Sequence, residues 1–240
     1  MLLMTIYNTL LSARKNKQKL LAILLDPDKV SLDSIAKTVE RISNLNADFI
    51  FVGGSLLFTN HLDELLKTIK KETTIPVVLF PGSAMQISPN ADAILFLNLI
   101  SGRNPEYLIS NQVIAAPLLK QTKLEVLSTS YLLIASGRET TASYISNTKP
   151  IPAHKPEIAT ATALAGFYIG HKIIYLDGGS GALNPVPEEM IKQVATTVDS
   201  PLIIGGGIRT KKQLQTAYDN GADLVVIGTV FELNELDFNI

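Results

Sequence analysis

The stretch that decides the fold is IIGGGIRT at residues 203–210, an apolar run that stops at three consecutive glycines. A second apolar run, VVIGT at residues 225–229, stops at a glycine one unit later. Glycine lets backbone N–H groups approach an anion closely, and the loops after the seventh and eighth strands of (β/α)₈ barrels commonly bind phosphate. A single loop of this kind fits a simple tight turn equally well. The pair favours a phosphate site.

Upstream of these loops, short runs rich in Ile, Val and Leu alternate with amphipathic stretches of helical length, which is the pattern of repeated βα units. Eight strands are predicted, at residues 20–27, 47–55, 75–83, 91–100, 124–136, 172–180, 200–208 and 222–230. Helices are predicted at residues 31–45, 60–72, 105–119, 156–170, 187–198 and 210–220. An open doubly wound sheet would carry an early G-x-G-x-x-G turn, which is absent. We therefore expect one domain, a TIM barrel over residues 1–240.

Two connections depart from the regular βα pattern. Only SAMQISPN, at residues 83–90, joins the third and fourth strands, which is too short for an ordinary crossover helix. We expect the third helix to be missing or replaced by an extended segment, leaving an apolar flank for a long hydrocarbon ligand. Residues 136–155 are the least regular stretch, and we expect a long loop or a partly helical lid there.

Composition excludes several classes of protein. The formal net charge of -1 provides no basic field for a nucleic-acid backbone, and the chain has no cysteine for disulfides or thiolate metal sites. No apolar stretch reaches the roughly 18 residues that a spanning helix needs, and the N-terminus lacks the features of a signal peptide. We expect a soluble, cytoplasmic protein that binds no nucleic acid.

The first predicted strand ends in LLDPDK, with Asp26 and Asp28 separated by a proline. Neither aspartate has a histidine or cysteine beside it, so the metal that fits is a hard cation such as Mg²⁺, shared with substrate phosphates. The alternative is helix capping or loop hydrogen bonding, which fits Asp28 well and Asp26 less well.

The sixth predicted strand ends in YLDGGSGA, which places Tyr175 and Asp177 on the same face. Asp177 could accept a proton from a substrate hydroxyl, and Tyr175 could hydrogen-bond the substrate. The alternative is a buried carboxylate paired with a lysine or an arginine. The three histidines, His61, His154 and His171, lie away from the strand ends and are interpreted as structural or surface residues.

LLDPDK, FVGGS, LFPGS, LFLNLISGRNPEYLI, YLDGGSGA, IIGGGIRT and VVIGT, in this order, resemble the geranylgeranylglyceryl phosphate synthase family, which includes bacterial heptaprenylglyceryl phosphate synthases. The resemblance implies a Mg²⁺-dependent prenyltransferase joining the 3-hydroxyl of sn-glycerol 1-phosphate to C1 of a polyprenyl diphosphate. It implies that Asp26 and Ser55 hold the metal, and that Asp177 and Tyr175 act at the reacting hydroxyl. It implies that the acceptor is bound by Tyr175, Leu176, Asp177, Gly178, Gly179, Ser180, Gly181, Gly206, Gly207, Gly228 and Thr229.

Two positions depart from the family pattern. The family usually has glutamate where this chain has Asp177, so the acceptor shifts or the base works through a water molecule. Leu24 stands where some heptaprenyl-type members have lysine, and this resembles the geranylgeranyl-type branch, which implies geranylgeranyl diphosphate as donor.

Other functions stay open at this point. Another phosphate-binding barrel enzyme, an isomerase or a lyase, would use the same glycine loops without a prenyl groove. A barrel without chemistry, kept as a binding protein, is the second alternative. Barrels of this kind often associate, so we also expect a homo-oligomer.

Overall fold

The computed structural model describes residues 5–233, which form a closed barrel of eight parallel strands in the order β1 to β8. Each strand pairs with its neighbour along the chain, and β8 closes the barrel against β1. The strands are β1 Leu20–Leu25, β2 Phe49–Val52, β3 Val77–Leu79, β4 Ala93–Leu99, β5 Glu125–Leu133, β6 Ile173–Asp177, β7 Leu202–Gly205 and β8 Leu224–Ile227. Every strand predicted from the sequence is confirmed.

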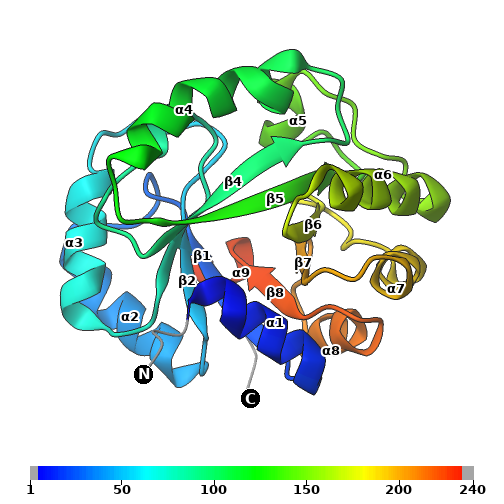
Figure 1. Cartoon of the computed structure of the whole chain (residues 1–240). Helices are drawn as coiled ribbons and strands as arrows, with labels where there is room; N and C mark the ends of the chain where they lie inside the picture. The colour runs from blue at the N-terminus through cyan, green and yellow to red at the C-terminus, as the bar shows by residue number, and fades with distance from the viewer. Residues whose placement is uncertain (1–4, 234–240) are drawn as a thin grey trace.

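The helices surround the strands (Figure 1). They are α1 Ile6–Asn16, α2 Ile35–Asn44, α3 Leu62–Glu72, α4 Asn111–Lys120, α5 Thr141–Ser146, α6 Pro156–Ile169, α7 Glu188–Thr197, α8 Lys211–Asp219 and α9 Thr229–Glu232. Short 3₁₀ turns η1 Leu32–Ser34 and η2 Ala84–Gln86 and a π-turn η3 Glu106–Ser110 complete the elements. Within residues 5–233, no helix is both long and apolar enough to cross a bilayer.

Two apolar layers follow from the alternation of side chains along each strand. Ile174 and Leu176 of β6 point outward and pack in the layer between the strands and the helices. Tyr175, between them, points into the barrel and packs in the inner layer with Phe51 of β2. The barrel interior is therefore a packed core beneath the C-terminal ends of the strands.

The third crossover has no α-helix, as predicted. Only the turn η2 stands between β3 and β4, and α4 packs beside it. The turn is fixed by Gln86, whose buried amide donates to the carbonyl of Gly54 at 2.7 Å and accepts from its N–H at 3.3 Å. The segment between β3 and β4, where a regular barrel would have a helix, thus holds the loop after β2.

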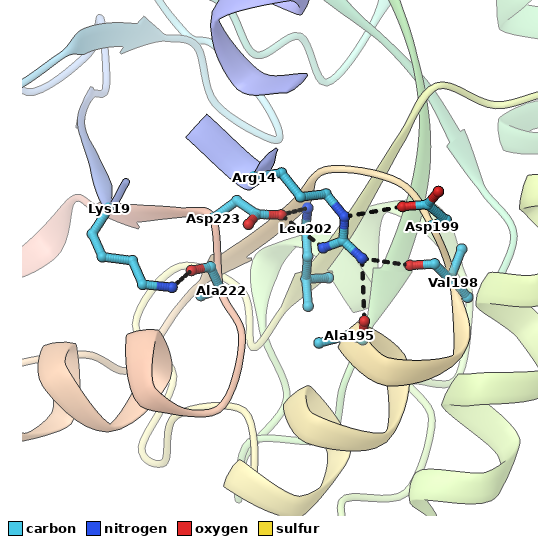
Figure 2. A network of polar contacts seen from close by, with 8 residues as sticks. All are labelled: Arg14, Lys19, Ala195, Val198, Asp199, Leu202, Ala222 and Asp223. Carbon is cyan, nitrogen blue, oxygen red and sulfur yellow. Dashed lines mark hydrogen bonds and ion pairs between the residues drawn. The ribbon is translucent and has the colours of Figure 1, made fainter. Parts of the chain in front are cut away.

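Helix α1, which was not among the predicted helices, is anchored at the N-terminal ends of the strands. The Arg14 guanidinium lies 3.1 Å from Oδ2 of Asp223 and also donates to the carbonyls of Ala195 and Val198 (Figure 2). The same Asp223 oxygen accepts from the N–H of Leu202 at the start of β7. These contacts tie α1 to the barrel end opposite the glycine loops.

Candidate active site

A cavity of about 430 Å³ opens at the C-terminal ends of the strands, where barrel enzymes place their chemistry. One part is polar, with the glycine loops after β6, β7 and β8. The other part is apolar and is walled by β4, η3, α4 and α5, with lining residues that include Leu95, Leu97, Tyr107, Ala115 and Ile145. The cavity thus joins a polar end, suited to an anion, to an apolar groove next to the β3–β4 connection that has no α-helix. We call this groove the apolar lane.

The π-turn shapes the wall of this apolar lane. Asn98 of β4 donates to the carbonyl of Leu108 at 2.6 Å, and Gln112 of α4 donates to the carbonyls of Leu97 and Tyr107. Such π-turns are frequent at functional sites. Here the wide turn holds Tyr107 against the cavity.

Asp177, at the end of β6, is the buried carboxylate of the cavity, with 6% of its surface exposed. Its Oδ2 accepts a hydrogen bond from the Tyr131 hydroxyl at 2.6 Å, and its Oδ1 accepts from the N–H of Gly179 at 2.8 Å. Burial raises the pKa of Asp177 above its ordinary value, and the two hydrogen bonds oppose that rise. No described lysine or arginine pairs with Asp177, so the ion-paired alternative is wrong.

An aromatic cluster forms the floor beneath this carboxylate. Tyr175 stacks on Phe80 with ring centroids 5.3 Å apart and meets Tyr131 edge-on at 5.5 Å. Burial and the nearby charge of Asp177 raise the pKa of Tyr175 well above its ordinary value, so the phenol stays protonated. Tyr175 and Asp177 both line the cavity, as predicted from their spacing.

The glycine loops after β6 and β7 interlock. Gly206 has a φ of +79°, and a Cβ there would lie 2.7 Å from Oδ1 of Asp177 and 2.7 Å from the N of Gly179. Only glycine allows so close an approach at this backbone angle. Ser180, Gly181 and Gly207 of these loops line the same cavity, together with Gly228 and Thr229 after β8.

Two residues of the predicted acceptor site are placed differently. The side chain of Leu176 points away from the cavity into the outer apolar layer, because alternation along β6 puts it opposite Tyr175 and Asp177. Gly178 is not among the residues that line the cavity, although its N–H group lies close to Gly206.

Asp26, after β1, lies at the cavity mouth. Its Oδ2 is 3.2 Å from the Nζ of Lys29, which is also 3.0 Å from Oε2 of Glu232. Ser55 lines the same cavity on the neighbouring loop. Within residues 5–233, no cluster of three or more histidine, cysteine or acidic residues could hold a metal. A carboxylate and a hydroxyl that line one cavity nevertheless fit Mg²⁺, which is typically bound by one or two carboxylates together with substrate phosphates and waters.

Asp28 has the loop role that the sequence left open. Its carboxylate accepts from the N–H groups of Phe58 and Thr59 at 2.8 and 3.0 Å, and from the Thr59 hydroxyl. All these partners lie in the loop after β2. Asp28 therefore joins the first two loops of the catalytic end.

The chain matches the profile of the PcrB family over residues 13–240. It belongs to the PcrB family. Among curated relatives, the geranylgeranylglyceryl phosphate synthase of Flavobacterium johnsoniae is 52% identical over 231 residues, covering 96% of this chain and 95% of that protein. The protein of the same name from Thermococcus gammatolerans is 45% identical over 217 residues, covering 90% of this chain and 85% of that protein.

A solved structure of the family superimposes closely on this chain. It is the crystal structure of (S)-3-O-geranylgeranylglyceryl phosphate synthase from Thermoplasma acidophilum in complex with its substrate sn-glycerol-1-phosphate. The TM-score is 0.90 at 34% sequence identity, and the match covers 96% of this chain and 92% of that chain. This chain therefore shares its barrel fold with that synthase.

Several residues of this PcrB-family site carry little or no signal in the sequence. Tyr131 meets Asp177 only through the pairing of β5 with β6. Gln86 stands in a short polar segment with no motif. Arg209 of IIGGGIRT donates to the carbonyls of Leu183 and Ala182 and so holds the β6 loop. The alternating pattern of β5 could have placed Tyr131 inside the barrel, but it could not have given its partner.

Two of the three histidines, His61 and His171, make hydrogen bonds that join segments of the barrel. His61 Nε2 lies 2.7 Å from the carbonyl of Pro27, and Nδ1 of His171 lies 2.6 Å from the hydroxyl of Ser130. Both interactions join neighbouring segments of this PcrB-family barrel. Neither histidine lines the cavity.

Proposed function

We propose that this protein joins the 3-hydroxyl of sn-glycerol 1-phosphate to C1 of geranylgeranyl diphosphate and releases diphosphate. The observation that carries the proposal is one cavity that joins interlocked glycine loops, a buried Asp177 and an apolar lane. The relatives named above are geranylgeranylglyceryl phosphate synthases, and the Thermoplasma synthase was solved with sn-glycerol 1-phosphate bound.

The glycine loops orient the acceptor. Backbone N–H groups around Gly206, Gly207 and Gly228 would bind the phosphate, because glycine leaves them open to an anion. This would direct the glycerol end toward Asp177 and fix the reacting hydroxyl near the carboxylate.

Asp177 would accept the proton of the 3-hydroxyl as that oxygen bonds to C1. The bond from C1 to the diphosphate oxygen breaks in the same exchange, and diphosphate leaves with the electron pair. Tyr131 and the N–H of Gly179 hold the carboxylate in place during this step. The proton lost by the hydroxyl is transferred to Asp177 and then passes to solvent.

Asp26 and Ser55 would hold Mg²⁺ with the donor diphosphate. An ion held there would supply positive charge to offset the charge of the diphosphate leaving group. Lys29, which is ion-paired with both Asp26 and Glu232, holds these two carboxylates together at the cavity mouth. Mg²⁺ dependence is thus part of the proposal.

The apolar lane would hold the isoprenoid tail. Burial of such a chain contributes about 25 cal/mol for each Å² removed from water. A wall of leucine, isoleucine and alanine also keeps water away from C1, which carries positive character as the diphosphate leaves.

The decisive experiment mixes the purified protein with Mg²⁺, sn-glycerol 1-phosphate and equimolar farnesyl, geranylgeranyl and longer prenyl diphosphates. Mass spectrometry identifies the products. We expect geranylgeranylglyceryl phosphate as the main product, little product with sn-glycerol 3-phosphate, and loss of activity with EDTA or in Asp26→Asn. A folded protein that forms no ether with any donor would exclude prenyl transfer and favour another phosphate-barrel enzyme or a binding protein.

We also propose that the protein forms a homo-oligomer. Large apolar side chains are exposed on α4 and α6, among them Val113, Ile114, Tyr168 and Ile169. Apolar surface of this kind commonly marks a protein contact. Sedimentation equilibrium is expected to give a multiple of the chain mass and a lower mass for Val113→Asp. A monomer at all concentrations would contradict this part of the proposal.

A further inference from the structure

The segment that connects β5 to α5 lies directly on the glycine loop after β6. The carbonyl of Ser136 accepts from the N–H of Asn184 at 3.0 Å. The Thr140 hydroxyl lies 2.8 Å from where a Cβ on Gly179 would stand. Residues 136–140 therefore cover the loop that we assign to the acceptor.

Arg138 is the cation of this covering segment. Its Nη2 lies 2.3 Å from where a Cβ on Gly181 would stand, so the guanidinium fills the space above that glycine. Gly181 lines the cavity and has a φ of +73°. The Arg138 side chain is exposed, and it forms no hydrogen bond or ion pair with the residues between 5 and 233.

The two cations that line the cavity, Lys29 and Arg209, are already engaged, whereas Arg138 stands at its edge over Gly181. Lys29 is paired with Asp26 and Glu232, and both outer nitrogens of Arg209 donate to backbone carbonyls. The cavity also contains the buried carboxylate of Asp177. A phosphate bound near these carboxylates is repelled by them, so a nearby positive charge that is not already paired would strengthen its binding.

We propose that Arg138 binds and positions the phosphate of the acceptor. The inference rests on the proposed function, because it takes the glycine loops as the glycerol phosphate site. The guanidinium presents paired N–H donors that match two phosphate oxygens, and it already stands over Gly181, which lines the cavity. Arg138 thereby supplies charge to a site otherwise built from backbone N–H groups.

The test measures binding without turnover. Calorimetry with sn-glycerol 1-phosphate, and separately with inorganic phosphate, compares the wild-type protein with Arg138→Ala and Arg138→Lys. We expect Arg138→Ala to weaken both ligands about tenfold to a hundredfold, and Arg138→Lys to be intermediate, since lysine keeps the charge but not the paired donors. Lys37→Ala removes the same charge from the exposed face of α2 and should bind as the wild-type protein does.

Steady-state kinetics separate binding from a structural role. In Arg138→Ala, the KM for the glycerol phosphate should rise by a similar factor, while the KM for the prenyl diphosphate and kcat stay within about threefold. Added guanidinium at millimolar concentration should restore part of the lost affinity. Unchanged phosphate binding in Arg138→Ala would overturn the proposal, and so would an equal loss for both substrates with a lower melting temperature. Phosphate binding that depends on Arg138 in a wild-type protein without prenyl transfer would overturn only the proposed function.

Discussion

The hydroxyl of Tyr131 lies 2.6 Å from Oδ2 of Asp177, and both residues are buried in the barrel on adjacent strands. A hydrogen bond to a carboxylate favours its charged form, whereas burial favours the neutral form. Tyr131 therefore offsets part of the effect of burial on Asp177. The balance between the two sets the pH at which Asp177 can accept a proton.

Removal of this hydroxyl should move the pH dependence of catalysis. In Tyr131→Phe the pKa of Asp177 should rise further, because burial remains and one stabilising hydrogen bond is lost. The acid limb of the profile of kcat/KM against pH should move to higher pH, with about a three- to tenfold loss of activity on that limb. Tyr218→Phe, which alters a tyrosine bonded to the carbonyl of Leu20 far from the cavity, should leave the limb in place. An unchanged profile in Tyr131→Phe would remove Asp177 as the titrating base.

Replacement of the buried carboxylate should separate stability from activity. Asp177→Asn should lower kcat by about 10²- to 10⁴-fold, as expected for loss of a general base. It should leave the free energy of unfolding unchanged or raise it by about 1 kcal/mol at neutral pH, because a buried charge is removed. Asp177→Glu keeps the carboxylate and should retain more activity than Asp177→Asn.

The stability difference in Asp177→Asn should also depend on pH. Burial raises the pKa of Asp177 in the folded protein, so its contribution to stability is fully present below the ordinary aspartate pKa and is lost as pH rises through the folded value. Chemical denaturation over a pH series measures this. Asp177→Asn should be more stable than the wild-type protein only at pH values above the folded-state pKa of Asp177. A variant that is more stable at low pH would contradict a raised pKa for Asp177.

The close approach at Gly206 gives a prediction with a matched control. Gly206→Ala should cost about 2–3 kcal/mol in the free energy of unfolding and weaken acceptor binding more than tenfold, because the new Cβ meets Asp177 and Gly179. Gly170 has a φ of +103°, and a Cβ built there would have nothing within 4 Å. Gly170→Ala therefore measures only the cost of placing alanine at a positive φ. That variant should lose about 1 kcal/mol and keep wild-type kinetics. Equal binding losses in the two variants would exclude a specific role of Gly206.

The anchor of α1 should matter for stability and not for catalysis. Arg14→Ala should lower the free energy of unfolding by about 2–4 kcal/mol, since it removes the ion-pair partner of the buried Asp223 carboxylate, which keeps only the N–H of Leu202, and the donor to two carbonyls. Lys15→Ala, on the exposed side of the same helix, should change it by less than about 0.5 kcal/mol. Thermal and urea unfolding measure both variants, and similar losses in the two would show that α1 contributes only through its apolar face.

Much of the barrel could be predicted because its signals are local. Buried parallel strands read as runs of Ile, Val and Leu, and the glycines at their ends mark the catalytic side. The short segment between β3 and β4 likewise revealed the missing third helix, because chain length alone excludes a crossover helix there. Helix α1 was not among the helices delimited from the sequence, although its buried positions Ile6, Leu10 and Ala13 follow the helical spacing.

What the sequence by itself determined is therefore the number of strands, the end of the barrel that carries the chemistry, and the residue types gathered there. Only the tertiary structure decided which of these residues meet. Tyr131 and Asp177 are brought together by the register of β5 against β6, which pairs Tyr131 with Tyr175. Arg138 reaches Gly181 because the β5–α5 segment folds back over the next loop. These partners are distant in the chain, so the pairing of neighbouring strands and the packing of their loops fix them, which no local propensity can do.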